Sequence, residues 1–324
     1  MGISLLFLLL FLRQLDGLHF AAALAGADYR WLLAGIPVYF AGLWFRTLRW
    51  QALLQGLQHV PVRALFPYMA IGYMANDLLP ARIGELVRVY LTGRRLDLPK
   101  APILATIVLE RVSDGLVLVG MMAVAAVAYP VAAWVTALGV LMAAAFGGAT
   151  LLVVLAVLAR ATAERVGRSL AERLPLAVRL QVMAVAGGFM DGMAVLRRPR
   201  WLAAVGLHAV LSWLWEAAVF YAVGLALGLD LPFAAYVLAM ATANLATALP
   251  SSQAGIGPFE FFCAETLQLY GLPAGDAVTF ALLVHVVLIV PVVVAGLGYL
   301  AREQVSLSTV AERAMAGGPA AEGR

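Results

Sequence analysis

Long apolar runs, separated by short polar or charged stretches, make up most of this 324-residue chain. Five of them are long enough to cross the hydrocarbon core of a bilayer as helices, which takes about 20 residues. The predicted spans are 30–54, 101–129, 131–158, 201–227 and 274–300. Because these runs are continuous and do not alternate, they predict helices and not the strands of a membrane barrel.

Three apolar segments are too short to cross by themselves. The first, residues 1–12, resembles a signal sequence only superficially, and we expect residues up to about 25 to complete it as a helix. The other two, 64–79 and 233–249, each run into a proline, Pro80 and Pro250. We expect each to be the first arm of a hairpin that enters and leaves the membrane on one side, with its tip at the proline.

The two halves of the chain align with a nearly constant offset of 170 to 175 residues. The matched positions are Arg30-Trp31 with Arg200-Trp201, Pro61 with Pro232, Pro80 with Pro250, Glu85 with Glu260, Leu98-Pro99 with Leu272-Pro273, and Glu110 with His285. Chance similarity between apolar helices is the alternative. We predict one transmembrane domain, 1–302, built from an inverted repeat (about 1–129 and 131–302) with about six spanning helices and two re-entrant hairpins.

Composition and charge place the protein. Hydrophobic residues make up 64% of the chain and charged residues 12%, against about 25% charged in soluble domains. Basic stretches at 93–100 and 160–200 predict the cytoplasmic side, together with the C-terminus, whereas the loops at 129–131 and 228–232 lack Lys and Arg. We therefore expect an integral protein of the cell (cytoplasmic) membrane.

Two segments lie outside the predicted spans. The connector 160–200 is arginine-rich and amphipathic, and we interpret it as a cytoplasmic segment that either lies on the membrane surface or forms a solvated loop with helical pieces. The tail, 303–324, is rich in Ala, Gly and Glu, and we expect it to be disordered.

The first proline break carries the most charge among the apolar runs. Asn76 precedes it, and Arg82, Glu85 and Arg88 follow at a spacing of three residues, which puts them on roughly one side of a helix. We interpret them as a cluster that receives an anionic group. The alternative is an interfacial helix whose long side chains reach the surface.

Three more charges lie within a predicted span. Glu110 and Asp114 are one helical turn apart, so they need cationic partners: Arg111, or Arg82 and Arg88. The network is either a structural lock or one that is remade during transport.

Arg46 and Arg49 end a span, and we interpret them as interfacial anchors rather than ligands. Arg46 falls at the repeat position of Glu216, so the two could mark opposite ends of one pathway. Glu216, in an otherwise apolar helix, is the better functional candidate.

The second proline break combines prolines and glycines with Ser251 and Gln253, and Glu260 follows on the next helix. It could open a helix N-terminus toward an anion, or form a tight turn. His285 is either a hydrogen-bonded structural residue or a group that titrates near neutral pH.

Several classes of function lack their signatures. We find no nucleophile–base pair, metal-ligand cluster, nucleotide-binding loop or nucleic-acid motif, and the single Cys263 excludes an intrachain disulfide. We expect no enzyme, no cofactor and no nucleic-acid partner. A membrane-embedded transferase with Glu85 or Glu110 as base is the remaining enzymatic alternative.

Taken together, these stretches resemble the flippase-like, lysylphosphatidylglycerol synthase transmembrane-region family over residues 5–302. The motifs are Arg46-x-x-Arg49-Trp50, Asn76-x-Leu-Leu-Pro-x-Arg82-x-Gly-Glu85-x-x-Arg88, Glu110-Arg111-x-x-Asp114 and Pro250-Ser251-x-x-x-Gly-Ile-Gly-x-x-Glu260. Asp77 and Gln253 depart from the pattern, which has Asn and Gly there.

The resemblance implies a membrane domain that moves lipids between leaflets, here expected without the aminoacyl-transfer domain fused to some relatives. The expected partner is a membrane lipid with an anionic or polyprenyl-phosphate-type head group. The alternative is a non-transporting scaffold or accessory subunit of an envelope-lipid biosynthetic enzyme.

Overall fold

The computed structural model describes residues 2–14, 16–80, 83–128, 131–162, 165, 169, 175–248 and 253–315. Every regular element in these ranges is a helix, which confirms the all-α fold class. The helices are α1 (Gly2–Leu12), α2 (Gly17–Gly26), α3 (Tyr29–Leu54), α4 (Val62–Leu78), α5 (Gly84–Leu96), α6 (Lys100–Ala128), α7 (Ala133–Leu158), α9 (Leu176–Gly192), α10 (Pro199–Ala226), α11 (Phe233–Ala246), α12 (Pro258–Gln268), α13 (Ala274–Arg302) and α14 (Leu307–Met315), with short 3-10 turns η2 (Met193–Arg197) and η3 (Gln253–Gly255).

Two sets of four helices follow the same order: a long helix, two short helices and a second long helix. The first set is α3 to α6 and the second is α10 to α13. The matched prolines, Pro61 and Pro232, both precede the first short helix, with φ of −64° in each case and ψ of 140° and 146°. The sequence alignment therefore pairs residues that begin equivalent elements.

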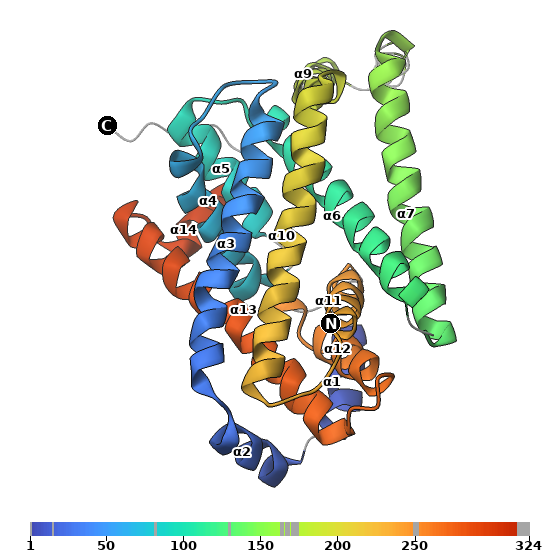
Figure 1. Ribbon diagram of the computed structural model, residues 1–324. Helices are drawn as coiled ribbons and strands as arrows, with labels where there is room; N and C mark the ends of the chain where they lie inside the picture. The colour runs from blue at the N-terminus through green and yellow to red at the C-terminus, as the bar shows by residue number, and fades with distance from the viewer. Residues whose placement is uncertain are drawn as a thin grey trace.

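The two sets pack against each other reciprocally. Figure 1 shows α3 and α10 side by side and running in opposite directions. The first short helix of each set packs against the last helix of the other, α4 on α13 and α11 on α6. This arrangement is compatible with an inverted repeat, which stays a prediction.

Close contact between α3 and α10 depends on a small residue. A methyl group on Gly42 would lie 3.3 Å from the Cβ of Trp215, and the indole of Trp215 stacks on Phe45 with ring centroids 6.4 Å apart. Glycine lets the two backbones approach closely, as is common between membrane helices.

Within the described part of the chain, five helical segments are long and apolar enough to span a membrane: α3, α7, 178–197, α10 and α13. A sixth is possible if α1 and α2, which meet at a bend of 77°, count as one span. The number of spans agrees with the prediction, but the segments that form them differ. The segment 178–197 lies in the predicted connector, and α6, predicted to span, is not among the five.

Residues 178–197 of the connector are apolar enough to span a membrane. In Figure 1, however, α9 is seen end-on and lies across the upper ends of α7 and α10. α9 packs on the start of α6, where a methyl group on Gly192 would lie 2.4 Å from the carbonyl oxygen of Pro102. The interpretation of residues 160–200 as a cytoplasmic connector stays a prediction.

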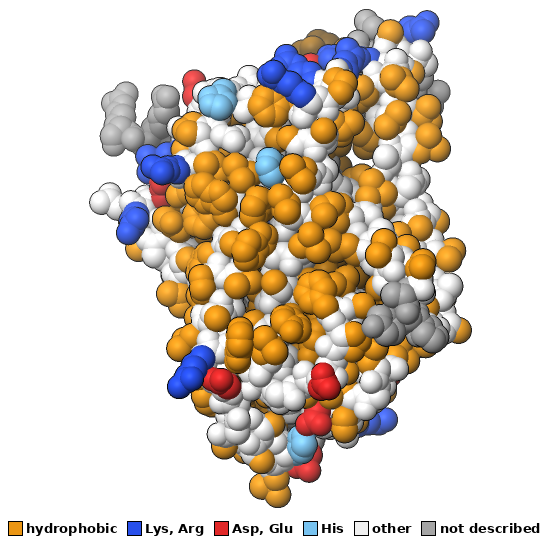
Figure 2. Space-filling model, viewed as in Figure 1, with side chains coloured by type: hydrophobic (Ala, Val, Ile, Leu, Met, Phe, Trp, Pro, Cys, Tyr) orange, Lys and Arg blue, Asp and Glu red, His pale blue; other side chains and the backbone are white. Residues whose placement is uncertain are grey.

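The surface separates into an apolar band and two charged ends. Figure 2 shows apolar side chains over the middle of the visible face, Lys and Arg gathered at its upper end, and Asp and Glu mainly at its lower end. In Figure 1 the upper end carries α9, whereas the lower end carries α2. This distribution agrees with an integral membrane protein.

The expectation of a wholly disordered tail was wrong. Residues Leu307–Met315 form α14, which packs on α5 and buries Val310. The Glu303 carboxylate before it accepts from the guanidinium of Arg95, near the end of α5. The expectation failed because residues 307–315 are amphipathic, and burial of their apolar face against α5 stabilises them as a helix.

We predict that Gly84→Ala will destabilise the first hairpin. A methyl group on Gly84 would lie 2.1 Å from the carbonyl oxygen of Gly72 and 2.6 Å from the backbone nitrogen of Asn76. Since backbone atoms cannot move aside as side chains do, the free energy of unfolding should fall by at least about 2 kcal/mol.

Thermal unfolding in detergent micelles measures this effect, with Gly206→Ala as the matched control. Gly206 is also helical, but a methyl group there meets no atom within 4 Å. Its replacement should leave stability unchanged or raise it by up to about 1 kcal/mol. Equal melting temperatures for the two variants would contradict the packing of α4 on α5.

Candidate functional site

A network of charged side chains lies inside the apolar body. Four arginines and four carboxylates contribute to it, from helices α3, α5, α6 and α10. Its members are Arg46, Arg49, Arg88, Arg111, Glu85, Glu110, Asp114 and Glu216. With all of them ionised the charges cancel, which is the condition under which so many ions are tolerated in a low-dielectric interior.

Two arginines hold the carboxylates of α6 at the centre of the network. Arg49, fully buried, binds both oxygens of Asp114 and lies 3.3 Å from Glu110. Arg88 of α5 donates two hydrogen bonds to Glu110, of 2.8 and 3.2 Å. The spacing of one helical turn between Glu110 and Asp114 lets both face the same cations. Of the pairings that the sequence left open, the structure shows Arg88 with Glu110 and Arg111 with both Glu110 and Asp114.

A second part of the network joins α3 to α10. Arg46 donates to Glu216 at 2.5 Å and to the hydroxyl of Tyr73 at 2.9 Å. The amide of Asn244, from α11, donates to the other oxygen of Glu216 at 2.8 Å. Each charge therefore has a partner on a different helix.

Two interpretations of the first long helix are wrong. Arg46 and Arg49 are not interfacial anchors, because both are buried and ion-paired. Nor do Arg46 and Glu216 mark opposite ends of a pathway, since they contact each other directly. Arg46 and Arg49 lie near the end of an apolar run, which is a position typical of the membrane interface. In the structure, however, α3 packs along α10 and both guanidinium groups are buried.

Tryptophans complete the burial. The Arg88 guanidinium lies 4.4 Å from the centre of the Trp50 ring, and that of Arg46 lies 4.3 Å from the Trp213 ring. The Trp213 indole N–H also donates to Asp114 at 2.9 Å. Cation–π contacts of desolvated arginines stabilise by about 2 kcal/mol. Tyr73, Trp213 and Asn244 were not predicted from the sequence, because nothing in an apolar run marks which polar group faces a charge.

The network opens at one edge. The side chains of Arg111 and Glu85 are 32% and 24% exposed, while all other members are 10% exposed or less. Arg111 contacts Glu110 at 3.0 Å and Asp114 at 3.2 Å, but its distance to Glu85, 3.7 Å, exceeds a hydrogen bond. This edge lies beside the first hairpin tip, where among the described residues the buried Oδ1 of Asn76 has no hydrogen-bond partner.

The second hairpin carries a smaller polar cluster. Glu260, in the first turn of α12, binds Nδ1 of His285 on α13 at 2.6 Å and accepts from the Gly257 amide at 2.7 Å. His285 Nε2 lies 3.1 Å from the carbonyl oxygen of Ala254, and its ring stacks on Phe259 at 4.2 Å. His285 is thus hydrogen-bonded, as one of the two interpretations required.

Some predicted site residues cannot be placed. Arg82 and Ser251 lie outside the described residues, and of Gln253 the structure describes only the backbone, in η3. Asp77, which the sequence analysis noted only as a departure from the family pattern, lies close enough to His285 for their charges to interact.

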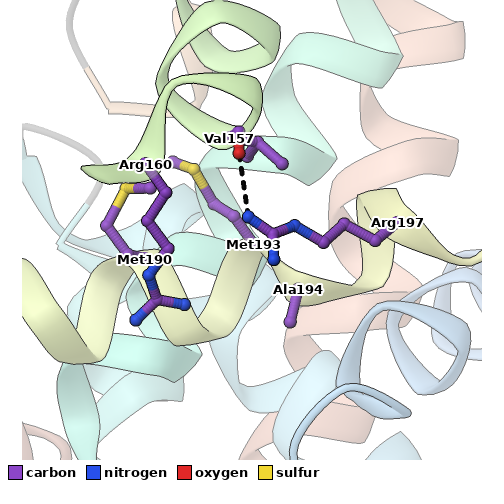
Figure 3. A pocket seen from close by; sticks show the side chains of 6 residues that line it. All are labelled: Val157, Arg160, Met190, Met193, Ala194 and Arg197. Atoms are coloured by element: carbon purple, nitrogen blue, oxygen red, sulfur yellow. Dashed lines mark hydrogen bonds between the residues drawn. The ribbon is translucent and has the colours of Figure 1, made fainter. Parts of the chain in front are cut away.

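A hollow at the end of α7 is separate from both clusters. It measures about 200 Å³ with the open space at its mouth, and Arg160 and Arg197 lie on its wall (Figure 3). Arg197 donates to the carbonyl oxygen of Val157 at 2.9 Å, and Arg160 binds Asp191 at 2.9 Å. The described residues hold no group of three or more His, Cys, Asp or Glu arranged for a metal ion.

We predict that Arg46→Met will destabilise the protein more than Arg46→Met combined with Glu216→Met. The single change leaves Glu216 buried without its cation, which costs about 3–5 kcal/mol. The double change removes both charges, so it should recover at least about 1 kcal/mol of that loss.

Chemical unfolding in detergent micelles measures these differences. Arg94→Met, at an exposed position of α5, is the control and should change stability by no more than about 0.5 kcal/mol. A double variant less stable than the single one would contradict the direct pairing of Arg46 with Glu216.

Comparison with known proteins places the chain. Residues 1–296 match the family model described as "Lysylphosphatidylglycerol synthase TM region". The chain is 27% identical to a protein named "Glycosyltransferase AglD" from Haloferax volcanii, over 96% of this chain and 55% of that protein. It therefore spans about half the length of that relative. It is also 25% identical to a "UPF0104 membrane protein" from Methanothermobacter thermautotrophicus, over 88% of this chain and 87% of that protein.

The predicted resemblance is confirmed, since the family match covers the helices that build both polar clusters. The chain belongs to the lysylphosphatidylglycerol synthase transmembrane-region family.

Proposed function

We propose that this protein moves an amphipathic lipid with an anionic head group between the leaflets of a membrane. The observation that carries the proposal is a buried, charge-balanced network that opens at Arg111 and Glu85 beside the first hairpin tip. Ionised groups inside a membrane protein are costly, and they usually mark the path of a polar substrate.

Arg111 is the arginine of the network that can turn toward a ligand while both carboxylates of α6 keep a cation. If Arg111 turned toward an incoming phosphate, Glu110 would keep Arg49 and Arg88, and Asp114 would keep Arg49. Arg49 and Arg88 lack this freedom, because they are enclosed by α6 and by Trp50. Arg111 is therefore the cation that we assign to the head group, with Arg82 of the same tip as a second candidate.

We further propose that the two four-helix sets form an inverted repeat whose hairpins are re-entrant. Arg46 and Glu216 occupy equivalent repeat positions, 170 residues apart, and contact each other directly. Two equivalent residues can touch only close to the axis that relates the halves. The charged network would then lie at the repeat interface, which is where transporters of this architecture bind their substrates.

A second candidate function follows from one relative. The similarity to the glycosyltransferase named AglD covers nearly the whole of this chain but only about half of that protein. The shared region could serve as the membrane module of an enzyme that acts on lipid-linked sugars. In that case the protein would be an accessory subunit of envelope-lipid biosynthesis. Its network would hold a lipid phosphate for a reaction without moving the lipid between leaflets.

We predict that Arg111→Gln will reduce the movement of an anionic lipid by about tenfold or more, since losing one charge-assisted contact to a phosphate costs about 1.5–3 kcal/mol. The assay uses the full chain reconstituted into liposomes with fluorescent phosphatidylglycerol or a polyprenyl phosphate. Accessibility of the label to an external quencher reports its leaflet.

Arg30→Gln is the matched control, because Arg30 is exposed at the other end of the molecule, at the start of α3. Its variant should move lipid at the wild-type rate. Equal rates for Arg111→Gln and wild type would refute the assigned role of Arg111. No movement by the wild type, together with binding of polyprenyl phosphate, would favour the accessory function.

A further inference from the structure

The contacts of His285 constrain the number of protons at the second hairpin. Its Nδ1 faces a carboxylate oxygen of Glu260 at 2.6 Å, and its Nε2 faces the carbonyl oxygen of Ala254 at 3.1 Å. A carbonyl oxygen only accepts, and so does an ionised carboxylate. A neutral imidazole has one N–H, so it cannot satisfy both contacts when Glu260 is ionised.

Both contacts hold when the pair carries one additional proton. Either His285 is an imidazolium that donates from both nitrogens, or Glu260 is protonated and donates to Nδ1 while Nε2–H donates to Ala254. The second oxygen of Glu260 accepts from the Gly257 amide in either case.

Removal of that proton must break one of the two hydrogen bonds. The tautomer that keeps Nδ1–H pointed at the ionised Glu260 retains the stronger, charge-assisted hydrogen bond. Nε2 then presents a lone pair to the carbonyl oxygen of Ala254, and the two atoms repel each other. The hydrogen bond that breaks is therefore the one that ties the hairpin tip to α13.

We propose that Glu260 and His285 form a binding site for one exchangeable proton, and that its loss releases the tip 253–257 of the second hairpin from α13. The tip has a backbone suited to this change. Ala254 has a left-handed φ of 54°, and Gly255 and Gly257 have φ of 72° and 98°. A non-glycine residue in that region is held there only by its surroundings.

Other ionisable side chains lie near Glu260 and His285, so the charge of this pair affects its surroundings. Asp77 of α4 lies within range of His285, Tyr39 of α3 within range of Asp77, and the thiol of Cys263 within range of Glu260. Glu216 of α10 is neutralised by Arg46. Deprotonation of the pair would leave the negative charge of Glu260 without a compensating cation, which is costly in a low-dielectric site.

The two hairpins differ in this respect. In each set the second short helix is tied to the following long helix by a pair of ionisable side chains, Arg88 with Glu110 in the first and Glu260 with His285 in the second. Arginine stays charged at any physiological pH, whereas histidine changes charge near neutrality. The first hairpin is therefore fixed, and the second responds to protons. Resting on the proposed function, this makes a proton the coupling ion for lipid movement.

The test measures exposure of the tip in purified full-length protein. Ile256→Cys, in the tip and 39% exposed, is labelled with a methanethiosulfonate reagent. Thiolate formation alone speeds labelling as pH rises, so the rate is divided by that of Leu269→Cys, at the exposed end of α12. The native Cys263 is buried, and the parent protein gives its background.

We expect the labelling ratio to rise about fivefold or more between about pH 5 and about pH 9, as a local opening would produce. Glu260→Gln should hold the ratio at its acid value throughout. The amide of a glutamine donates to Nδ1 and so reproduces the protonated site. Glu265→Gln, on the same helix and bonded to Gln14, should retain the full pH response. A ratio that stays flat in the parent, or that rises in Glu260→Gln, would overturn the proposal.

Nitrogen-15 NMR of the imidazole in the unsubstituted protein provides a test that does not depend on a variant folding. Above the transition we expect the Nδ1–H tautomer of His285; an Nε2–H tautomer, or no change, would refute the switch. Lipid movement is measured separately. A pH response without lipid movement would refute the proposed function alone, and lipid movement without a pH response would refute the proton site alone.

Discussion

The structure depends on neutralising charge where water is scarce. Eight ionised side chains lie inside a protein that is 64% hydrophobic, and each is tolerated because an opposite charge lies within 4 Å. Breaking such a pair costs several kcal/mol, which is a large part of a typical stability. The helices that carry the charges are therefore held in fixed relation, with α3 and α6 at the centre.

The same constraint divides the molecule into fixed and adjustable parts. Arg49 and Arg88 are enclosed, so the first hairpin is locked to α6. Arg111 lies at the open edge, and its removal from the network leaves every carboxylate of α6 with another arginine. The second hairpin is held by a histidine instead. A substrate would thus act at the first hairpin and a proton at the second, whose tip η3 packs on α4 of the first.

Two terminal helices support this core from outside. α1 packs on α12 and α14 packs on α5, so each hairpin has its second short helix covered by a segment from one end of the chain. Short helices gain little stability by themselves and depend on such packing. The tip of the second hairpin, residues 253–257, contains three positions of positive φ, at Ala254, Gly255 and Gly257.

The sequence by itself determined the membrane class, the helices, the prolines that begin equivalent elements and the family, because hydropathy and turn chemistry act locally along the chain. It also identified every charged member of the network, since an ion in an apolar run is conspicuous. The tertiary structure decided the pairing: Arg46 with Glu216, and Arg49 with Asp114 rather than with the membrane surface. It also added the neutral partners Tyr73, Trp213 and Asn244 and the ordered helix α14. Ion pairing depends on which helices lie side by side, and that is fixed by packing over long sequence separations, not by local pattern.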